Sequence, residues 1–221
     1  MRESRVPLAA FALATAADLV CLAVGSDAGH LVAKSLLMPL LAAHAARCGA
    51  PRLLVAALLC GWGGDVLLLS DADPAFMAGM ACFAAGHLCY LALFRGYGPS
   101  RAPARVLAPV YAAVLVTTVA LLWPDLPPGL RVPVACYSTL LTAMAYGAAT
   151  RLGLAGGLGG ALFMLSDTLI ATGLADWPQA PRSDLWIMLT YALAQYLLVR
   201  GTLDERSASA TAYGEVRSTT P

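Results

Sequence analysis

Charged residues are scarce in this chain of 221 residues. Asp, Glu, Lys and Arg together make up 12% of it, about half of the roughly 25% that is usual in water-soluble domains. Hydrophobic residues make up 59%, and the formal net charge is only +1. No basic run is present that could form a nucleic-acid-binding surface. We therefore interpret the chain as an integral membrane protein with no nucleic-acid partner.

Patterns that mark a metal or redox centre are also missing. The six cysteines are scattered through apolar segments without a CxxC pair, which favours small buried side chains. His30, His44 and His87 fall at different depths, so they cannot share a zinc ion. Ser138 and Ser166 lack a nucleophile-elbow pattern and are weak candidates for a catalytic triad. The sequence predicts neither a metal nor a cofactor.

What the chain does have is a series of apolar segments. Each has about 16–20 residues, enough to cross roughly 30 Å of hydrocarbon. They span residues 7–25, 31–46, 53–69, 75–94, 106–123, 132–150, 156–175 and 185–200. The first resembles a signal peptide, but its apolar run continues to Val24, which favours an uncleaved anchor. We predict an all-α, polytopic bundle of eight transmembrane helices that forms one domain over residues 1–201.

Loop charges predict the orientation of this bundle. The two ends and every second loop are basic, whereas the other loops carry mainly aspartate. By the positive-inside rule, both termini are cytoplasmic and the number of spans is even. We place the protein in the cell membrane. Residues 202–221 are polar and read as a loosely ordered cytoplasmic tail.

Two aspartates interrupt the apolar segments. Asp65 lies in the third segment, directly after a glycine-rich stretch, and Asp167 lies in the seventh. A charge at membrane depth costs about 2.5–3.5 kcal/mol on insertion scales, so a functional role is the default interpretation. The glycines allow a neighbouring helix or a ligand to approach the backbone closely. Structural alternatives are an Asp65–Lys34 ion pair and a helix-packing contact of Asp167 and Ser166.

Other polar residues are candidates for binding a substrate in a common pocket, and most fall at similar depth, with His87 and Tyr90 somewhat deeper toward the cytoplasm. They are Lys34, His87, Tyr90, Tyr137, Ser138, Ser166, Tyr191 and Gln195. The alternatives are that the tyrosines simply pack as amphipathic side chains, that His87 is a satisfied interior residue, and that Lys34 extends to the membrane surface. Asp18 is a further buried acid for which the sequence offers no partner.

Two carboxyl groups in one dry pocket suggest acid–base chemistry. One can act as the acid while the other activates water, because different surroundings favour different protonation states. This suits hydrolysis of an acid-labile ether through an oxocarbenium-like state, as in glycoside hydrolysis. A pocket among membrane helices suits a lipid-like substrate. Composition alone leaves proton-coupled transport equally open.

Five motifs point to a family. They are KSLLMPLL at 34–41, GDVLL at 64–68, FAAGHLCY at 83–90, GALFMLSD at 160–167 and YALAQY at 191–196. In these motifs and their order, the chain resembles the YhhN/TMEM86 family of membrane proteins, whose characterised members are lysoplasmalogenases. Ser35 departs from the Lys-Pro pair of many bacterial relatives, which affects helix shape more than chemistry.

The resemblance implies a hydrolase that cleaves the vinyl ether bond of lysoplasmalogen, a lysophospholipid, without a cofactor. The products would be a fatty aldehyde and glycerophospho-ethanolamine or -choline. Asp65 and Asp167 would share the acid and base roles, Lys34 would hold the phosphate or tune an aspartate, and the other polar residues would orient substrate, water or the acids. The alternative is a proton-coupled transporter of a small molecule or lipid, or a lipid-binding membrane protein.

Overall fold

The structure, a computed structural model, describes residues 2–70, 72–98 and 104–218, with side chains described from residue 5 to 208 of these ranges. Within them the chain forms eight helices and no strand. They are α1 (Arg2–Val24), α2 (Asp27–Arg47), α3 (Arg52–Leu67), α4 (Asp73–Phe94), α5 (Ala104–Leu122), α6 (Pro128–Arg151), α7 (Gly153–Leu174) and α8 (Ser183–Ser218). All eight predicted segments are helical, so the all-α class is confirmed.

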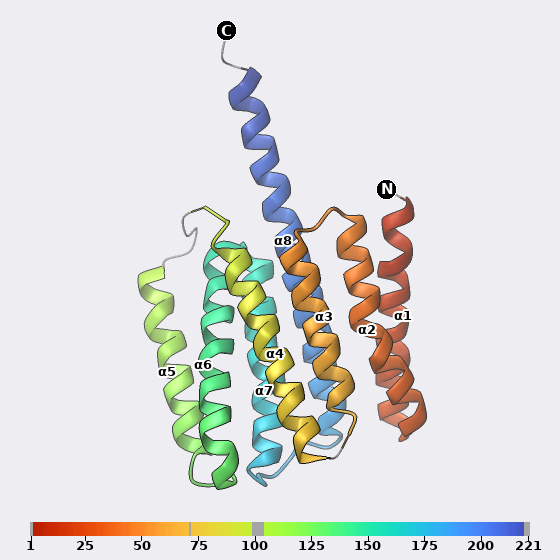
Figure 1. Cartoon of the computed structure of the whole chain (residues 1–221), viewed down its shortest axis with the longest axis vertical. Helices are drawn as coiled ribbons and strands as arrows, with labels where there is room; N and C mark the ends of the chain where they lie inside the picture. The colour runs from red at the N-terminus through yellow and green to blue at the C-terminus, as the bar shows by residue number, and fades with distance from the viewer. Residues whose placement is uncertain (1, 71, 99–103, 219–221) are drawn as a thin grey trace.

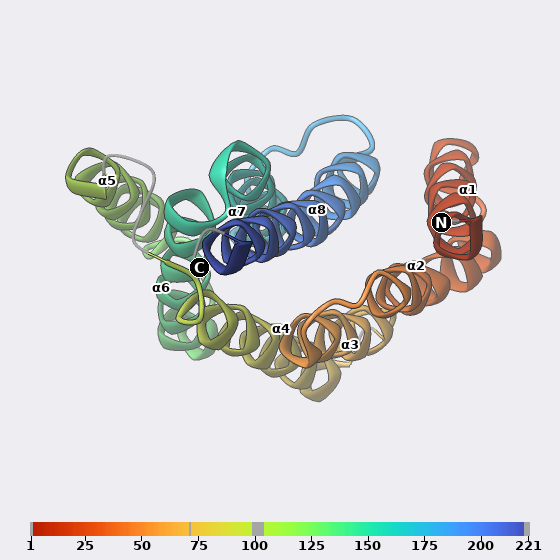
Figure 2. The same ribbon diagram turned by 90° about the horizontal axis from the view of Figure 1, so that it is seen from above.

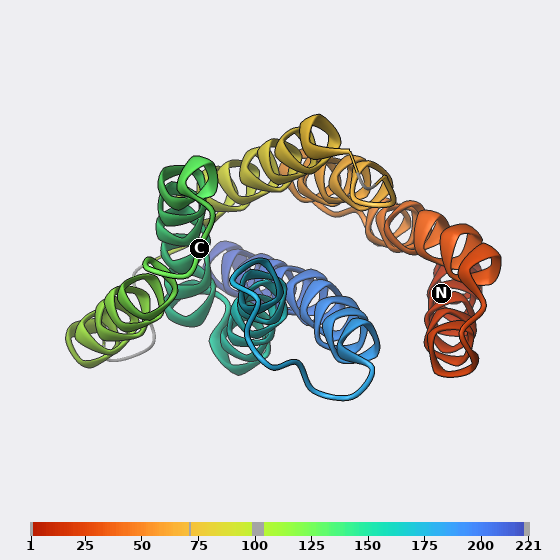
Figure 3. The same cartoon turned by 90° about the horizontal axis from the view of Figure 1, so that it is seen from below.

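The helices run alternately up and down, and α1 begins at the end of the bundle from which α8 projects (Figure 1). Helices α1, α2, α3, α4 and α6 form a curved row (Figure 2). Helices α7 and α8 pack on each other inside the curve, with α7 also against α6. Helix α5 packs mainly on α6 and has a single buried residue, Leu122. The view from the opposite end shows the loop between α7 and α8 (Figure 3).

Five of the eight helices are long and apolar enough to cross a membrane. They are α1 from Arg5 onward, α4, α5, α6 and α7. Helix α3 has 16 residues, about 24 Å at 1.5 Å per residue. Lys34 in α2 and Gln195 in α8 lower the hydropathy of the other two helices. The chain is therefore a multi-pass helical protein, and eight spans stay a prediction.

Helix α8 differs most from the prediction. It continues through Ser218, whereas the sequence suggested that it ends near Arg200 and that a loosely ordered tail follows. Figure 1 shows this last part extending beyond the other helices. Residues 201–218 contain three Ala, two Glu and two Arg beside five Ser or Thr and two Gly. Ala, Glu and Arg favour helix on their own, so a lack of apolar residues did not end the helix.

Helix α7 packs tightly between its two neighbours because it carries glycines at the contacts. A Cβ at Gly160 would lie 2.8 Å from the Ala145 Cα on α6. A Cβ at Gly159 would lie 3.0 Å from the Ala194 carbonyl oxygen and the Leu198 nitrogen on α8. Small residues let helices approach closely in this way in membrane proteins. The position of α7, which carries Asp167, therefore depends on these glycines.

We predict that Gly160→Ala destabilises the protein. The added methyl group meets backbone rather than a flexible side chain, and overpacking of this kind costs about 1–3 kcal/mol. Gly173→Ala on the same helix is the matched control, because its nearest neighbour is the Gln179 side chain at 4.0 Å. Thermal unfolding in detergent should show a lower midpoint for Gly160→Ala alone. An equal midpoint for both variants would contradict this account of the packing.

Candidate functional site

Asp65 belongs to a hydrogen-bonded network that joins three helices. Its side chain on α3 is 2% exposed and accepts a 2.8 Å hydrogen bond from the Tyr191 hydroxyl on α8. Gln195, one turn further along α8, donates to the same hydroxyl at 3.4 Å. Tyr90 on α4 donates to the side-chain Oε1 of Gln195 at 2.7 Å. All four residues are buried, so this network satisfies polar groups that have little access to water.

Asp167 belongs to a second network. The Tyr137 hydroxyl on α6 donates to the Asp167 carboxylate on α7. The same hydroxyl lies 3.0 Å from Nε2 of His87 on α4. His87 is 1% exposed, whereas Asp167 and Tyr137 are only partly buried. Each aspartate is thus held by a tyrosine from a different helix.

Two phenylalanines lie between the networks. The Phe163 ring is 4.9 Å from the His87 ring and 5.5 Å from the Tyr191 ring, centroid to centroid. Phe83 packs edge-on against both Phe163 and Tyr191. Asp65 and Asp167 remain close enough for their charges to interact. The two acids are therefore neighbours separated by an aromatic partition rather than partners in one open space.

The glycines before Asp65 make this arrangement possible. A Cβ at Gly64 would lie 2.5 Å from a carbon of the Phe83 ring. A Cβ at Gly61 would lie 3.2 Å from the Tyr191 hydroxyl. The close approach that the sequence suggested at these positions is therefore present, and the groups that approach are the ring and the hydroxyl beside Asp65.

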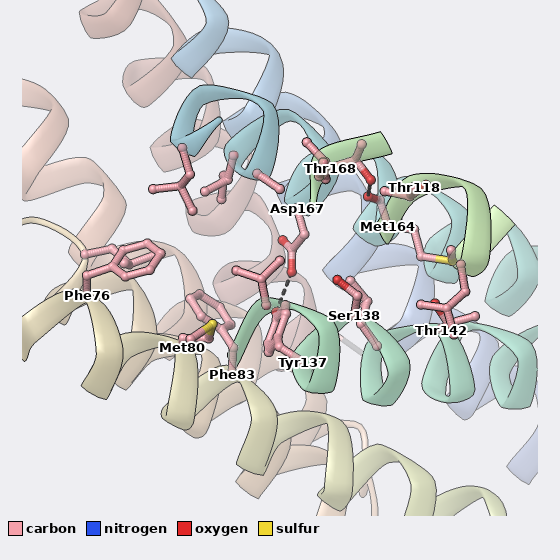
Figure 4. Close-up of a pocket in the computed structure, with 18 residues that line it drawn as sticks. Phe76, Met80, Phe83, Thr118, Tyr137, Ser138, Thr142, Met164, Asp167 and Thr168 are labelled. Atoms are coloured by element: carbon pink, nitrogen blue, oxygen red, sulfur yellow. Dashed lines mark hydrogen bonds between the residues drawn. The ribbon is translucent and has the colours of Figure 1, made fainter. Parts of the chain in front are cut away.

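Asp167 and Tyr137 lie in the middle of a pocket that encloses about 760 Å³, including space open to the surroundings. Phe76, Met80 and Phe83 line it on one side of the pair, as Figure 4 shows. Toward the other side lie Thr118, Thr142 and Met164, and Ser138 is next to the pair. Apart from these hydroxyls, the hydroxyl of Thr168 and the Asp167 carboxyl group, the lining is apolar. A chain of methylene groups would fit such a lining, with the carboxyl group placed along it.

The structure does not bring all predicted site residues to this pocket. Asp167, Tyr137 and Ser138 line it, and His87 contacts it through Tyr137. Asp65, Tyr90, Tyr191 and Gln195 form the neighbouring network. Ser166 points to α8, where its hydroxyl donates to the Ile187 carbonyl oxygen at 3.1 Å. Lys34 is partly buried on α2, within electrostatic range of Asp65.

Asp18 has a partner that sequence reasoning missed. Its Oδ1 lies 2.8 Å from Nδ1 of His30 on α2, whereas its Oδ2 is buried without a hydrogen-bond partner in the described structure. Lys34 is within electrostatic range of Asp18 as well as Asp65. Their positions in the sequence could have suggested this pair. Asp18 is near the end of one helix and His30 near the start of the next, so the two must lie at similar depth.

Among the described residues, no group of three or more His, Cys, Asp or Glu side chains is arranged to hold a metal ion. The site therefore consists of two carboxyl groups, four hydrogen-bonding aromatic side chains, an amide and a partly buried ammonium group. Such a set can donate, accept and relay protons.

A model of the YhhN family matches residues 29–202. The chain belongs to the YhhN family. Its match begins in α2, so α1 and Asp18 lie outside the region that the family model covers. No solved structure matches the chain.

Three similar curated proteins carry the name lysoplasmalogenase TMEM86B. The one from Homo sapiens is 37% identical over 155 residues, 70% of this chain and 65% of the relative. The one from Sus scrofa is 39% identical over 142 residues, 64% of this chain and 59% of the relative. The one from Rattus norvegicus is 35% identical over 151 residues, 68% of this chain and 61% of the relative. The chain thus matches less than two thirds of the length of each relative.

We predict that Tyr191→Phe destabilises this YhhN-family protein by about 1–3 kcal/mol, because it leaves a buried carboxyl group without its donor. Tyr146→Phe is the control, since the Tyr146 hydroxyl makes no hydrogen bond within the described structure. Thermal unfolding in detergent measures both. Combined with Asp65→Asn, the effects should be non-additive, since the two side chains are in contact. Simple additivity would show that the hydrogen bond between them does not form.

Proposed function

We propose that this chain is a membrane-embedded hydrolase that cleaves the vinyl ether bond of lysoplasmalogens. The products are a fatty aldehyde and a glycerophospho-ethanolamine or -choline. The observation that carries the proposal is the Asp167–Tyr137 pair in the middle of an apolar pocket. The relatives named lysoplasmalogenase support the same reaction.

The reaction needs a proton donor at carbon and an acceptor for a proton of water. Asp167 gives its proton to the vinyl carbon that is not bonded to oxygen, which leaves an oxocarbenium ion. Water adds to the carbon that is bonded to oxygen and loses a proton to a carboxylate. The hemiacetal then breaks its bond to the glycerol oxygen, which takes up the hydroxyl proton, and the aldehyde is released.

Asp167 is the acid that touches the substrate, because it lines the pocket. Asp65 shares the acid–base work, and Tyr191, Gln195 and Tyr90 fix its position. Lys34 balances the charge of Asp65. Ser138 orients substrate or water beside Asp167, and Ser166 holds α7 against α8.

The apolar parts of the pocket determine where the alkenyl chain lies. The side lined by Phe76, Met80 and Phe83 presents only hydrocarbon, aromatic and thioether surface. The other side adds the hydroxyls of Thr118 and Thr142. We place the chain along the first side and the glycerol hydroxyl toward the second, which puts the vinyl ether between them at Asp167.

The test is aldehyde release from an alkenyl lysophospholipid by the purified, detergent-solubilised protein. We expect Asp167→Asn and Asp65→Asn each to lower the rate by at least roughly a hundredfold, the usual contribution of a positioned acid or base. Asp184→Asn, an exposed aspartate at the start of α8, should leave the rate unchanged.

Two outcomes would decide against the proposal. Activity that survives in both variants would exclude the acid–base pair. A folded native protein that releases no aldehyde with either headgroup would exclude the reaction itself, and uptake of the same lipid into vesicles would then favour transport.

We also propose that all eight helices cross the cell membrane as one domain over residues 1–201. Both termini, with the polar segment 202–221, would be cytoplasmic. An even number of spans is supported by α1 and α8, which begin and end at the same end of the bundle (Figure 1). The basic loops lie at that end, and cytoplasmic loops are enriched in Lys and Arg.

Cys48 tests this orientation, because it is exposed between α2 and α3, at the end where the termini lie. A membrane-impermeant maleimide should label it in inside-out vesicles and not in right-side-out vesicles. Cys48→Ser should remove the signal and identify its source. Labelling of Cys48 in right-side-out vesicles would reverse the proposed orientation.

A further inference from the structure

His87 carries a buried atom that the network does not satisfy. Its Nε2 lies 3.0 Å from the Tyr137 hydroxyl, but its Nδ1 is buried and has no hydrogen-bond partner in the described structure. An unpaired buried polar atom costs about 1–3 kcal/mol, so its presence calls for an explanation. The Phe163 ring packs on the His87 ring in an edge-to-face arrangement and offers no hydrogen-bond acceptor in its own plane.

The imidazole is neutral in this arrangement. A charged imidazolium would have two N–H donors, and only one of the two nitrogens has a partner. The second donor would carry part of a charge into an apolar environment, which is more costly than an unpaired neutral atom. The ring therefore carries one proton, and that proton is either on Nε2 or on Nδ1.

The position of that proton is linked to Asp167, because the Tyr137 hydroxyl has only one hydrogen to donate. When Asp167 is ionised, Tyr137 donates to it and His87 must donate from Nε2, leaving Nδ1 bare. When Asp167 is protonated, it can donate to the Tyr137 oxygen, and Tyr137 then donates to a bare Nε2, with the histidine proton on Nδ1. The two states differ by one proton.

We propose that His87, Tyr137 and Asp167 form a proton relay that reloads Asp167 through Nδ1 of His87. In one concerted step, Nδ1 takes up a proton from solvent, the Nε2 proton passes to the Tyr137 oxygen, and the Tyr137 proton passes to Asp167. After Asp167 has given its proton to the substrate, the neutral ring returns from the Nδ1–H to the Nε2–H tautomer, which restores the starting state for the next cycle. One proton enters, one carboxylate is neutralised, and no charge remains on the ring. His87 is thus a positioning residue that acts on Asp167 through Tyr137.

This inference rests on the proposed function, in which Asp167 gives up a proton in every reaction cycle. The attacking water releases one proton per cycle, and the relay provides a path for its return when Asp167 is not the group that accepts it. Other titratable groups near the His87–Tyr137–Asp167 relay are Asp65 on α3 and Tyr191 on α8. Helix α5 contributes only leucines and Thr118 to the pocket, so it adds no competing proton carrier.

The decisive measurement is ¹⁵N NMR of histidine-labelled protein in detergent, without substrate. The chain has three histidines, and His87→Gln identifies the signals of His87. We expect a neutral ring over the whole titration, with the proton on Nε2 at high pH and on Nδ1 once Asp167 is protonated at lower pH. Asp167→Asn and Tyr137→Phe should each abolish the change of tautomer, whereas Asp184→Asn should preserve it.

Either of two results would overturn the relay. A His87 tautomer that is constant with pH would show that its proton is not linked to Asp167. Protonation of both nitrogens together would show that the ring takes up charge instead of passing the proton on. Both results are independent of enzyme activity, so failure of the proposed reaction and failure of the relay are distinguishable.

A kinetic measurement tests the consequence for catalysis. His87→Gln keeps a hydrogen-bonding group near Tyr137 but has no second nitrogen that could take up a proton. If the return of a proton to Asp167 through the relay limits turnover, kcat of this variant should fall by about a hundredfold while KM is unchanged. The solvent isotope effect on kcat should also change. A variant with native kcat and isotope effect would show that Asp167 regains its proton without His87.

Discussion

The hydrogen bond from a tyrosine to each buried aspartate is the interaction on which this structure depends. Among apolar helices there is little water to satisfy a carboxyl group, so each acid needs a donor from another helix. Asp65 and Tyr191 join α3 to α8, and Asp167 and Tyr137 join α7 to α6. The donor in each pair is a tyrosine, whose long side chain holds the acid at a fixed distance from the backbone of the helix that carries the tyrosine.

Glycine makes this possible by letting helices come close enough for short polar side chains to meet. Gly64 leaves room for the Phe83 ring, and Gly160 brings α7 against Ala145 on α6. The same closeness sets the aromatic partition in place, with Phe163 in contact with one residue of each network. Helix packing and site geometry are therefore one feature, since a change in helix spacing would separate donors from acceptors.

The sequence was sufficient to predict the helices and the candidate residues, because an isolated polar residue stands out in an apolar segment. Asp65, Asp167, Tyr191 and Gln195 were all singled out in this way. The sequence did not show which groups meet across helices, because packing determines which helices are neighbours and how each is rotated about its axis. Periodicity therefore did not show that Asp167 lines the pocket while Asp65 does not, or that His30 pairs with Asp18.

The length of the turn between α6 and α7 determines whether Tyr137 and Asp167 face each other. Only Leu152 separates the two helices, and Gly153 closes the turn with φ +66°, a left-handed conformation that glycine adopts readily. Tyr137 and Asp167 are equidistant from Leu152 along the chain, so they meet as opposite residues of one helical hairpin. A single inserted residue here would turn α7 by about 100° about its axis and point Asp167 away from its donor. The length of this turn, together with the glycine contacts of α7, keeps the acid in register with its tyrosine.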